Sequence, residues 1–370
     1  MTALDRKTRV LIVDDSVVMR RLLSEAIASD PDMEVAGYAA DGRIALALMD
    51  QVAPDLVTLD VEMPVMDGLA TLQAMRTAGH TLPIIMFSTL TERGAEATID
   101  ALAMGASDYV AKPAGGGDYT TARQRIREAL IPKIKALCGR PHASLPAQPA
   151  SPQPKTLPYK KWTEPVSLVA IGSSTGGPNA LAQLLPTIPH DFPVPILIVQ
   201  HMPPAFTRFL AQRLTGLCHL PVEEAEEGDV VKPGKISVAP GGYHLVVKGR
   251  EPQTRMHITQ DAPENSCRPS VDVLFRSVAQ TFAGRTLGVV LTGMGQDGLR
   301  GCEALASVGG EIIVQDEATS VVWGMPGFVA REGLADAVLP IAAVGPHIVQ
   351  RVLARRTLAG ASRYIAAVTP

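Results

Sequence analysis

Short apolar, β-branched runs alternate with helical patterns over the first part of the chain. Five strands that alternate with helices predict a parallel, doubly wound sheet. Between the first two runs, the i, i+3, i+4, i+7, i+8 spacing of a buried helix face is followed by Met19, Leu22, Leu23, Ala26 and Ile27. The predicted strands are Val10–Val13, Glu34–Ala39, Leu56–Leu59, Pro83–Phe87 and Asp108–Val110.

The second part of the chain also alternates between strand and helix patterns, but it includes a segment with the pattern of a hairpin. Lys235–Ala239 and His244–Val247 flank Pro240-Gly241-Gly242, a pattern that predicts an antiparallel hairpin. We therefore expect a second parallel α/β sheet, Rossmann-like, with a β-hairpin insertion. Its predicted parallel strands are Ser167–Ile171, Pro195–Val199, Thr286–Leu291 and Glu311–Val314.

A proline-rich segment separates the two parts. Gly139–Pro158 holds six prolines in twenty residues, with Ala, Ser and Gln between them. Such a stretch favours extended polyproline II geometry and cannot build a core; the alternative is a long surface loop within one domain. Because 370 residues also exceed what one core usually holds, we predict a domain over 1–138, a linker over 139–164 and a second domain over 165–370.

Composition narrows the function classes. Hydrophobic residues make up 46% and charged residues 19%, so both domains can bury cores. The net charge of −3 gives no electrostatic footprint for nucleic acid or an anionic membrane. No apolar run reaches the length of a membrane span, and the N-terminus lacks the apolar core of a signal peptide. We expect a cytoplasmic protein. Its cysteines are scattered along the chain, which favours free thiols over a disulfide framework or a zinc site. They are Cys138, Cys218, Cys267 and Cys302.

Polar residues gather where the strands of the first domain end. The carboxyl ends of such strands converge on one edge of the sheet, and clustered carboxylates there would hold a hard cation such as Mg²⁺. A carboxylate in this place can also attack a phosphoryl group. Taken singly, each acidic residue could be a helix cap or a turn residue. The set is Asp14, Asp15, Asp60, Ser88 and Lys112.

A glycine-rich turn opens the second domain. Residues 172–176 form G-x-S-x-G with Ser174 at its centre, directly after a predicted strand and before a proline at a first helical position. The glycines permit a sharp turn that exposes the serine, and the backbone N–H groups of the helix start can stabilise an oxyanion. A phosphate-binding or dinucleotide-binding turn is the alternative, but neither G-x-x-x-x-G-K-[ST] nor G-x-G-x-x-G is present.

Two later strand ends supply the partners of a serine nucleophile. His201 ends the next predicted strand, and Asp297 lies in a glycine-rich loop after another. A hydroxyl, an imidazole and a carboxylate at one sheet edge are the inventory of a serine triad. The chain order Ser…His…Asp differs from the Ser…Asp…His order of α/β-hydrolases. As alternatives, His201 could be a bonded loop residue, Asp297 a turn or cap residue, and Ser173 or Thr175 the nucleophile. His219 and His244 stand in less apolar contexts.

Residues 9 to about 135 resemble a response-regulator receiver domain, with the stretches LIVDDS, LDVEMPVMDG, MFSTLT and DYVAKP. The resemblance implies a flavodoxin-like fold, a phosphoacceptor at Asp60, and a histidine kinase of the chemotaxis type as phosphodonor. It implies Mg²⁺ held by Asp14, Asp15, Asp60 and the backbone of Glu62. The implied switch residues are Ser88, Tyr109 and Lys112.

Residues 166 to about 355 resemble the CheB family of chemotaxis protein-glutamate methylesterases, with the stretches IGSSTGGP, VQHMPPAFT, CRPSVDVLF, LTGMGQDG and QDEATSVVWGMP. The family pattern implies a triad of Ser174, His201 and Asp297, with Thr175 and Met294 beside the nucleophile. Cys267 stands where a more polar, basic or imidazole residue is expected.

The resemblance implies a phosphorylation-activated hydrolase that demethylates glutamate methyl esters, and deamidates glutamines, on cytoplasmic domains of chemoreceptors, with no cofactor in the esterase reaction. Two other classes stay open. The second domain could be a binding module that catalyses nothing, which labelling by an active-site serine probe would separate. A DNA-binding regulator is disfavoured by the net charge and by the lack of a helix-turn-helix pattern after the linker.

Overall fold

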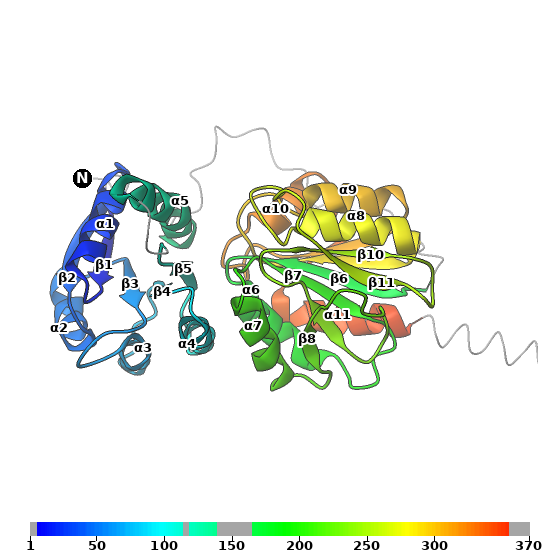
Figure 1. Ribbon diagram of the computed structural model, residues 1–370, viewed down its shortest axis with the longest axis horizontal. Helices are drawn as coiled ribbons and strands as arrows, with labels where there is room; N and C mark the ends of the chain where they lie inside the picture. Colours follow the sequence, from blue (N-terminus) through cyan, green and yellow to red (C-terminus); the bar gives the residue numbers. More distant parts are fainter. Residues whose placement is uncertain (1–5, 114–117, 139–164, 355–370) are drawn as a thin grey trace, which may run out of the picture. The chain divides into compact units, whose positions relative to one another are not determined.

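The computed structural model describes residues 6–113, 118–138 and 165–354, and the chain divides into two compact units (Figure 1). The division falls between Ser151 and Pro152, within the predicted linker. The linker itself lies outside the described residues, so its proposed bounds stay a prediction. Each unit is described below by itself.

The N-terminal unit is built on a five-stranded parallel sheet in the order β2-β1-β3-β4-β5. Its central strands are buried on both faces, which is why they read as continuous apolar runs in the sequence. All five predicted strands are confirmed to within two residues at either end. The strands are β1 (Thr8–Val13), β2 (Met33–Ala39), β3 (Leu56–Asp60), β4 (Ile84–Ser88) and β5 (Asp108–Ala111).

Five helices cover this sheet (Figure 1). On one face α1 (Val17–Ala28) packs beside α5 (Tyr119–Cys138). The predicted apolar stripe of α1 is confirmed, because Leu22, Leu23, Ala26 and Ile27 are all buried. The other face carries α2 (Gly42–Val52), α3 (Gly68–Thr77) and α4 (Glu92–Ala103). The helices that follow β1 to β4 each begin after a side chain that accepts a hydrogen bond from the first turn: Ser16, Asp41, Asp67 and Thr91.

The C-terminal unit is built on a seven-stranded sheet in the order β14-β13-β12-β6-β7-β9-β8, with every pair parallel. The four predicted parallel strands are confirmed, whereas the three-residue strands β8 and β14 were not predicted because they are too short to show a pattern. The strands are β6 (Leu168–Ser173), β7 (Ile196–Gln200), β8 (Val222–Glu224), β9 (Ile236–Val238), β12 (Thr286–Val290), β13 (Glu311–Gln315) and β14 (Ala337–Leu339).

Helices cover both faces of this sheet as well (Figure 1). One face carries α8 (Val271–Phe282), α9 (Leu299–Ser307) and α10 (Met325–Arg331); the other carries α6 (Gly177–Leu184), α7 (Phe206–Thr215) and α11 (Ile341–Leu353). Two 3₁₀ turns, Leu185–Thr187 and Ala283–Arg285, extend α6 and α8. One core of this unit lies under α8, where Phe275 and Phe282 are almost completely buried. Each such side chain stabilises the fold by about 1.5–3 kcal/mol.

The predicted hairpin forms with different strands. β9, within the predicted first arm, joins the main sheet beside β7, whereas β10 (His244–Lys248) pairs antiparallel with β11 (Arg255–Thr259). The reason lies in the segment between β9 and β10, where the Gly241 N–H donates to Thr207 Oγ1 at 2.9 Å. A Cβ on Gly241 would lie 2.3 Å from the carbonyl carbon of Pro203. The glycine therefore lets the chain pass under another loop, not reverse on itself.

Strand order reverses between β1 and β3 in the first sheet and between β6 and β12 in the second, where β8 and β9 are also interchanged at one edge. In open α/β sheets, ligands bind at such switch points, outside the carboxyl ends of the strands. The acidic residues of the first unit and the serine turn of the second lie at these two places.

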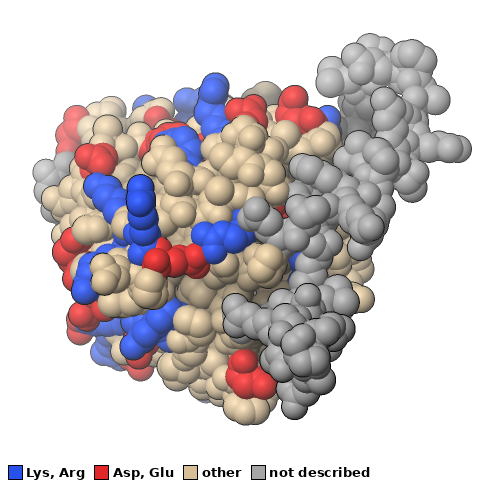
Figure 2. Space-filling view, turned by 90° about the vertical axis from the view of Figure 1, so that its right-hand side faces the viewer, with Lys and Arg blue, Asp and Glu red and all other residues tan. Residues whose placement is uncertain are grey.

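Among the described residues, no helix has the length and apolarity needed to cross a membrane. Basic and acidic side chains intermingle on the face drawn in Figure 2.

Candidate functional sites

An acidic cluster lies at the switch point of the N-terminal unit. Asp14 and Asp15 follow β1, and Asp60 ends β3. One carboxylate oxygen from each lies within 4.8 Å of the others. Lys112 reaches into the cluster from the end of β5, with its Nζ 2.7 Å from Asp60 Oδ2 and 3.1 Å from Asp14 Oδ2. The structure therefore brings together the residues that the sequence places at different strand ends.

The electrostatics of this cluster fit a divalent cation. Burial raises the pKa of Asp60 to about 6, and the neighbouring Asp14 carboxylate adds to the rise, while Lys112 opposes it. Burial also raises the pKa of Asp14, whose Oδ2 atom is buried and accepts no hydrogen bond despite the nearby ammonium group. Crowded oxygen donors with an open acceptor position suit Mg²⁺. The Glu62 side chain turns to Arg93, so it is the main chain of Glu62 that lies against Asp60.

The two remaining switch candidates point elsewhere. The buried Ser88 hydroxyl donates to the carbonyl oxygen of Gly94 at 2.8 Å, on the first turn of α4, and lies 3.2 Å from that of Thr89. Tyr109 is buried with its ring 5.3 Å from the ammonium of Lys133. Burial raises the pKa of this phenol well above its usual value. Ser88 therefore holds α4 in this structure, and its hydrogen bond to Gly94 would have to break before it could reach Asp60.

Ser174 occupies a tightly anchored turn between β6 and α6. The Ser174 N–H donates to the carbonyl of Thr292 at 3.1 Å, and Gln200 Nε2 donates to the Ser174 carbonyl at 2.9 Å. Gly176, which has a φ of 77°, starts the helix. A Cβ on that glycine would lie 2.6 Å from the Val321 side chain, so both backbone conformation and space require glycine there. The turn therefore holds Ser174 directly before the N-terminus of a helix.

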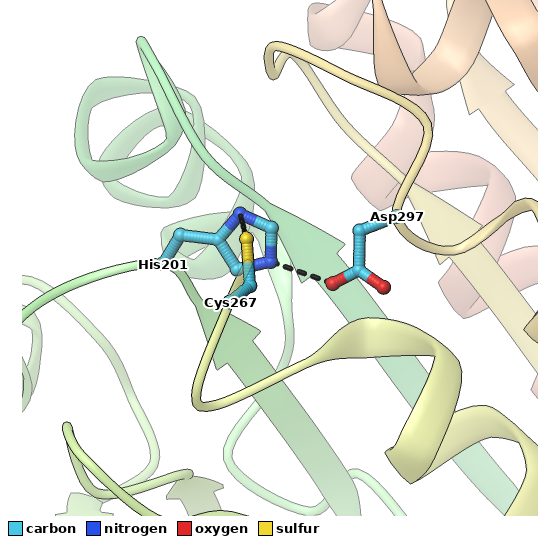
Figure 3. A group of neighbouring side chains, drawn as sticks. All are labelled: His201, Cys267 and Asp297. Atoms are coloured by element: carbon cyan, nitrogen blue, oxygen red, sulfur yellow. Dashed lines mark hydrogen bonds and ion pairs between the residues drawn. The ribbon is translucent and has the colours of Figure 1, made fainter. Parts of the chain in front are cut away.

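His201 and Asp297 form a direct pair (Figure 3). His201 Nε2 lies 2.7 Å from Asp297 Oδ2, and the Asp297 side chain is only 2% exposed. Because a carboxylate only accepts hydrogen bonds, Nε2 carries the proton and Nδ1 is the acceptor in the neutral ring. Burial opposes a charge on the ring, but hydrogen bonds with Asp297 and Cys267 more than offset it and raise the pKa of His201 to about 9.

Asp297 is held by four further donors, three at the start of α8 and one in the loop before it. Its carboxylate accepts hydrogen bonds from Ser270 Oγ at 2.8 Å and Asn265 Nδ2 at 3.0 Å, as well as from the N–H groups of Val271 and Asp272 at 2.7 and 3.1 Å. Burial alone would raise the pKa of Asp297, but His201 and these donors hold it well below its usual range. Asp297 is therefore ionised, in one orientation, and complements the helix dipole.

Backbone register places Ser174 next to this pair. β6 and β7 are neighbours in which Ser173 pairs with Gln200, so Ser174 and His201 follow paired positions. β12, which leads to Asp297, adjoins β6 on the other side. The Ser174 hydroxyl takes part in none of the hydrogen bonds found among the described residues, and catalytic hydrogen bonds commonly tighten only when substrate binds. The serine triad thus stays a prediction for Ser174, with its other two members in contact.

Thr175 and Met294 lie on the two sides of the serine turn. Thr175 is buried, and its carbonyl accepts a hydrogen bond from Thr292 Oγ1 at 3.0 Å. Met294 is half-buried in the loop after β12. The preceding residue, Gly293, is so close that a Cβ there would lie 2.9 Å from Ser174 Cβ. Both segments border Ser174, as the resemblance implies; their proposed roles towards an oxyanion or substrate stay predictions.

His244 is more deeply buried than the polarity of its sequence neighbours indicates. It is fully buried at the start of β10 although its sequence neighbours are less apolar. Its Nδ1 accepts a hydrogen bond from the Ser270 N–H at 3.2 Å, and its Nε2 lies 3.1 Å from the carbonyl of Ala262. Both ring nitrogens therefore stabilise the segment that leads into α8.

Sequence reasoning did not single out Asp272, the hub beneath Asp297. This carboxylate is 1% exposed and accepts hydrogen bonds from the N–H groups of Gly298 and Gly301, at 2.9 and 2.7 Å, and from Asn265 Nδ2 at 2.8 Å. Burial raises the pKa of Asp272 to about 6, and the Asp297 charge adds to the rise. The only sequence signal is an acidic residue in the first turn of a helix, which by itself indicates a helix start.

We expect Asp272→Ala to lower the free energy of unfolding by about 2–4 kcal/mol, because it leaves buried N–H groups without acceptors. Asp272→Asn keeps one acceptor oxygen and should lose about half as much. Urea unfolding of both variants measures the difference. Equal stability of Asp272→Ala and the wild type would contradict the role of the hub.

Together, these sites define a class: a receiver unit with a phosphoacceptor-type acidic cluster, joined to an α/β hydrolytic unit. The response regulator receiver domain profile matches residues 10–123, and the CheB methylesterase profile matches residues 169–348. The chain belongs to the CheB family of protein-glutamate methylesterases, as the sequence predicted.

Relatives match nearly the whole chain. A protein of Trichodesmium erythraeum named protein-glutamate methylesterase/protein-glutamine glutaminase is 51% identical over 350 residues, which cover 94% of this chain and 99% of the relative. A protein of the same name from a Nocardioides species is 50% identical, over 94% of this chain and 96% of its own length. The crystal structure of the Thermotoga maritima CheB methylesterase catalytic domain is 42% identical, covers 50% of this chain and 98% of that one, and has a TM-score of 0.49.

Proposed function

We propose that this protein hydrolyses γ-methyl esters of glutamate side chains on the cytoplasmic domains of chemoreceptors, and deamidates glutamine side chains by the same acyl route. The observation that carries the proposal is the contact between His201 and Asp297 at 2.7 Å beside the serine turn. An imidazole oriented by a buried carboxylate, next to a serine on a strand-to-helix turn, is the machinery of acyl transfer. The names of the relatives give the substrate class.

In the proposed mechanism, Ser174 Oγ attacks the ester carbonyl carbon while His201 Nδ1 accepts the hydroxyl proton. The tetrahedral intermediate then breaks its bond to the methoxy oxygen, and the imidazolium returns the proton, so that methanol leaves. Water attacks the acyl-serine with the same base and releases glutamate. Asp297 keeps the proton on Nε2 throughout, so Nδ1 is the base of the neutral ring, which is the form that predominates above the raised pKa of about 9. Backbone N–H groups around Thr175 and Met294 would stabilise the oxyanion.

Control would come from the acidic cluster. Asp60 would attack the phosphoryl group of a phosphohistidine on a chemotaxis-type kinase, with Lys112 as a cationic contact for the phosphoryl oxygens. Mg²⁺, held by Asp14, Asp15, Asp60 and the main chain of Glu62, neutralises phosphoryl charge when it is bound. The added charge of about −2 would draw the Ser88 hydroxyl away from Gly94 and release the first turn of α4. Tyr109 would shift with it. We expect the unphosphorylated receiver to obstruct access to Ser174.

We expect Asp60→Asn to remove activation without removing the basal reaction. Methanol release from methylated receptor membranes should rise severalfold for the wild type on addition of acetyl phosphate and Mg²⁺, and not at all for this variant. Asp50→Asn, an exposed carboxylate on α2, is the matched control and should respond like the wild type. A variant lacking residues 1–138 should be active without phosphodonor; lower activity than the full chain would contradict obstruction by the receiver.

A further inference from the structure

A cysteine thiol faces the base nitrogen of the proposed triad. Cys267 Sγ lies 3.5 Å from His201 Nδ1, the ring nitrogen that does not contact Asp297, and Figure 3 draws the sulfur in front of the imidazole ring. The two residues are 66 positions apart; Cys267 comes from the loop between β11 and α8, and His201 follows β7. The nitrogen that should accept the serine proton is thus shared with a sulfur atom that the hydrolytic mechanism does not need.

The loop that carries Cys267 is rigidly built. Asn265 and Ser266 both have positive φ values, 52° and 62°, and backbone hydrogen bonds join Glu264 and Cys267 in both directions, at 3.1 and 2.8 Å. This is the geometry of a tight two-residue turn. Arg276 fixes the turn through two bonds to the Glu264 carboxylate, at 2.7 and 2.5 Å. The thiol is therefore held in place, and positive φ at two non-glycine residues is a conformational cost maintained at this site.

The distance between the sulfur and the nitrogen is close to the separation of two ligands on a tetrahedral metal ion. Zinc binds thiolate sulfur at about 2.3 Å and imidazole nitrogen at about 2.0–2.1 Å, so two such ligands at a tetrahedral angle lie about 3.6 Å apart. The observed separation is 3.5 Å. Asp297 accepts the Nε2–H of the same ring, which is the usual partner of a metal-bound histidine and leaves Nδ1 as the ligand atom.

We propose that Cys267 Sγ and His201 Nδ1 bind a soft divalent metal ion, Zn²⁺ or a similar one, and that this ion inhibits hydrolysis. Atoms of His201, Cys267 and Asp297 lie within 4.8 Å of one another. Asp297 already accepts bonds from five donors, so it acts as the support of His201, and water fills the remaining positions on the metal. On binding, the thiol loses its proton to solvent and the metal takes the lone pair that would accept the Ser174 proton.

The two candidate metal sites found among the described residues then differ in the metal ions that they select. The cluster of Asp14, Asp15 and Asp60 offers only oxygen atoms and suits Mg²⁺, whereas the sulfur and nitrogen pair selects Zn²⁺ and similar ions. The side chain of His201 is 12% exposed and Cys267 is half-buried, so a hydrated ion can reach the pair. The inhibitory part of this proposal rests on the proposed role of His201 in hydrolysis; the binding part does not.

Binding is tested first, on the full chain with a non-thiol reductant. Co²⁺, which replaces Zn²⁺ in such sites, should give the near-ultraviolet charge-transfer band of a thiolate complex with the wild type, and Zn²⁺ should bleach it. Cys267→Ser and Cys267→Ala should lose the band. Cys218→Ser, which removes another half-buried thiol, should keep it. A wild-type protein without the band, or Cys267 variants with it, would overturn the metal site.

Inhibition is tested by methanol release against Zn²⁺ concentration, without phosphodonor. Zn²⁺ should inhibit the wild type and Cys218→Ser at the same concentration, with reversal by EDTA, and should require at least about tenfold more for Cys267→Ser. Equal sensitivity of the wild type and Cys267→Ser would overturn the inhibition. A wild type that binds Co²⁺ through thiolate but releases no methanol from methylated receptors would refute the proposed hydrolysis and leave the metal site standing.

Discussion

Ser174→Ala should lower kcat for methanol release by at least about 10⁴-fold and leave the fold intact. The substitution removes the only atom that forms the acyl bond, and loss of a triad nucleophile typically leaves a residual rate roughly 10³–10⁴-fold above that in water. The hydroxyl is half-buried and makes none of the hydrogen bonds found among the described residues, so its loss should change the free energy of unfolding by less than about 0.5 kcal/mol. Methanol release and thermal unfolding measure the two effects.

The neighbouring serine supplies the matched control. The Ser173 hydroxyl is fully buried and donates to Gln200 Oε1 at 2.7 Å, so Ser173→Ala should cost stability but keep the nucleophile. A fluorophosphonate probe should therefore label the wild type and Ser173→Ala, and fail to label Ser174→Ala. Labelling that follows Ser173 would show that the nucleophile is misassigned. No labelling of the wild type would favour the binding-module alternative.

Features that depend on strand ends could be predicted from the sequence. A buried parallel strand is a short apolar run in any context, and the residue after it must lie at the carboxyl edge of the sheet. This is why the contacts of Asp60 with Lys112, and of His201 with Asp297, could be expected although 52 and 96 residues separate the partners. The alternation of strands and helices determines the sheet topology, and the topology determines which polar side chains meet at the carboxyl edge of the sheet.

Features that depend on packing between loops could not be predicted. Lys235–Ala239 and His244–Val247 have the pattern of two hairpin arms, and only the contact of Gly241 with the loop after β7 separates them. In the same way, Asp272 looks like an ordinary first-turn residue until α9 brings its N–H groups against it. The position of Cys267 beside His201 requires a turn with two positive φ values, which neither Asn265 nor Ser266 demands by its type.

Asp297→Asn should lower kcat by about 10⁴-fold with little change in KM. Asparagine has nearly the same shape, but one of its two terminal atoms is an amide donor. Asp297 Oδ2 now accepts from both His201 and Val271, while Oδ1 accepts from three other donors. Whichever way the amide turns, its NH₂ group faces donors, so either the imidazole or the start of α8 loses an acceptor. If the NH₂ faces His201, the ring must accept at Nε2, which puts the proton on Nδ1 and removes the base.

The exposed carboxylate Asp191 gives a control of equal charge change, since Asp191→Asn should leave kcat within a factor of two. A purely structural role for Asp297 predicts a different outcome: a destabilised variant whose folded fraction keeps a normal kcat. Measuring kcat per folded molecule, with the folded fraction taken from thermal unfolding, separates the two. The variant should also lose the Co²⁺ thiolate band only in part, since Cys267 Sγ remains and only the support of His201 is removed. A normal kcat per folded site would mean that the imidazole needs no carboxylate to orient it, and the proposed acyl-transfer mechanism would have to be abandoned.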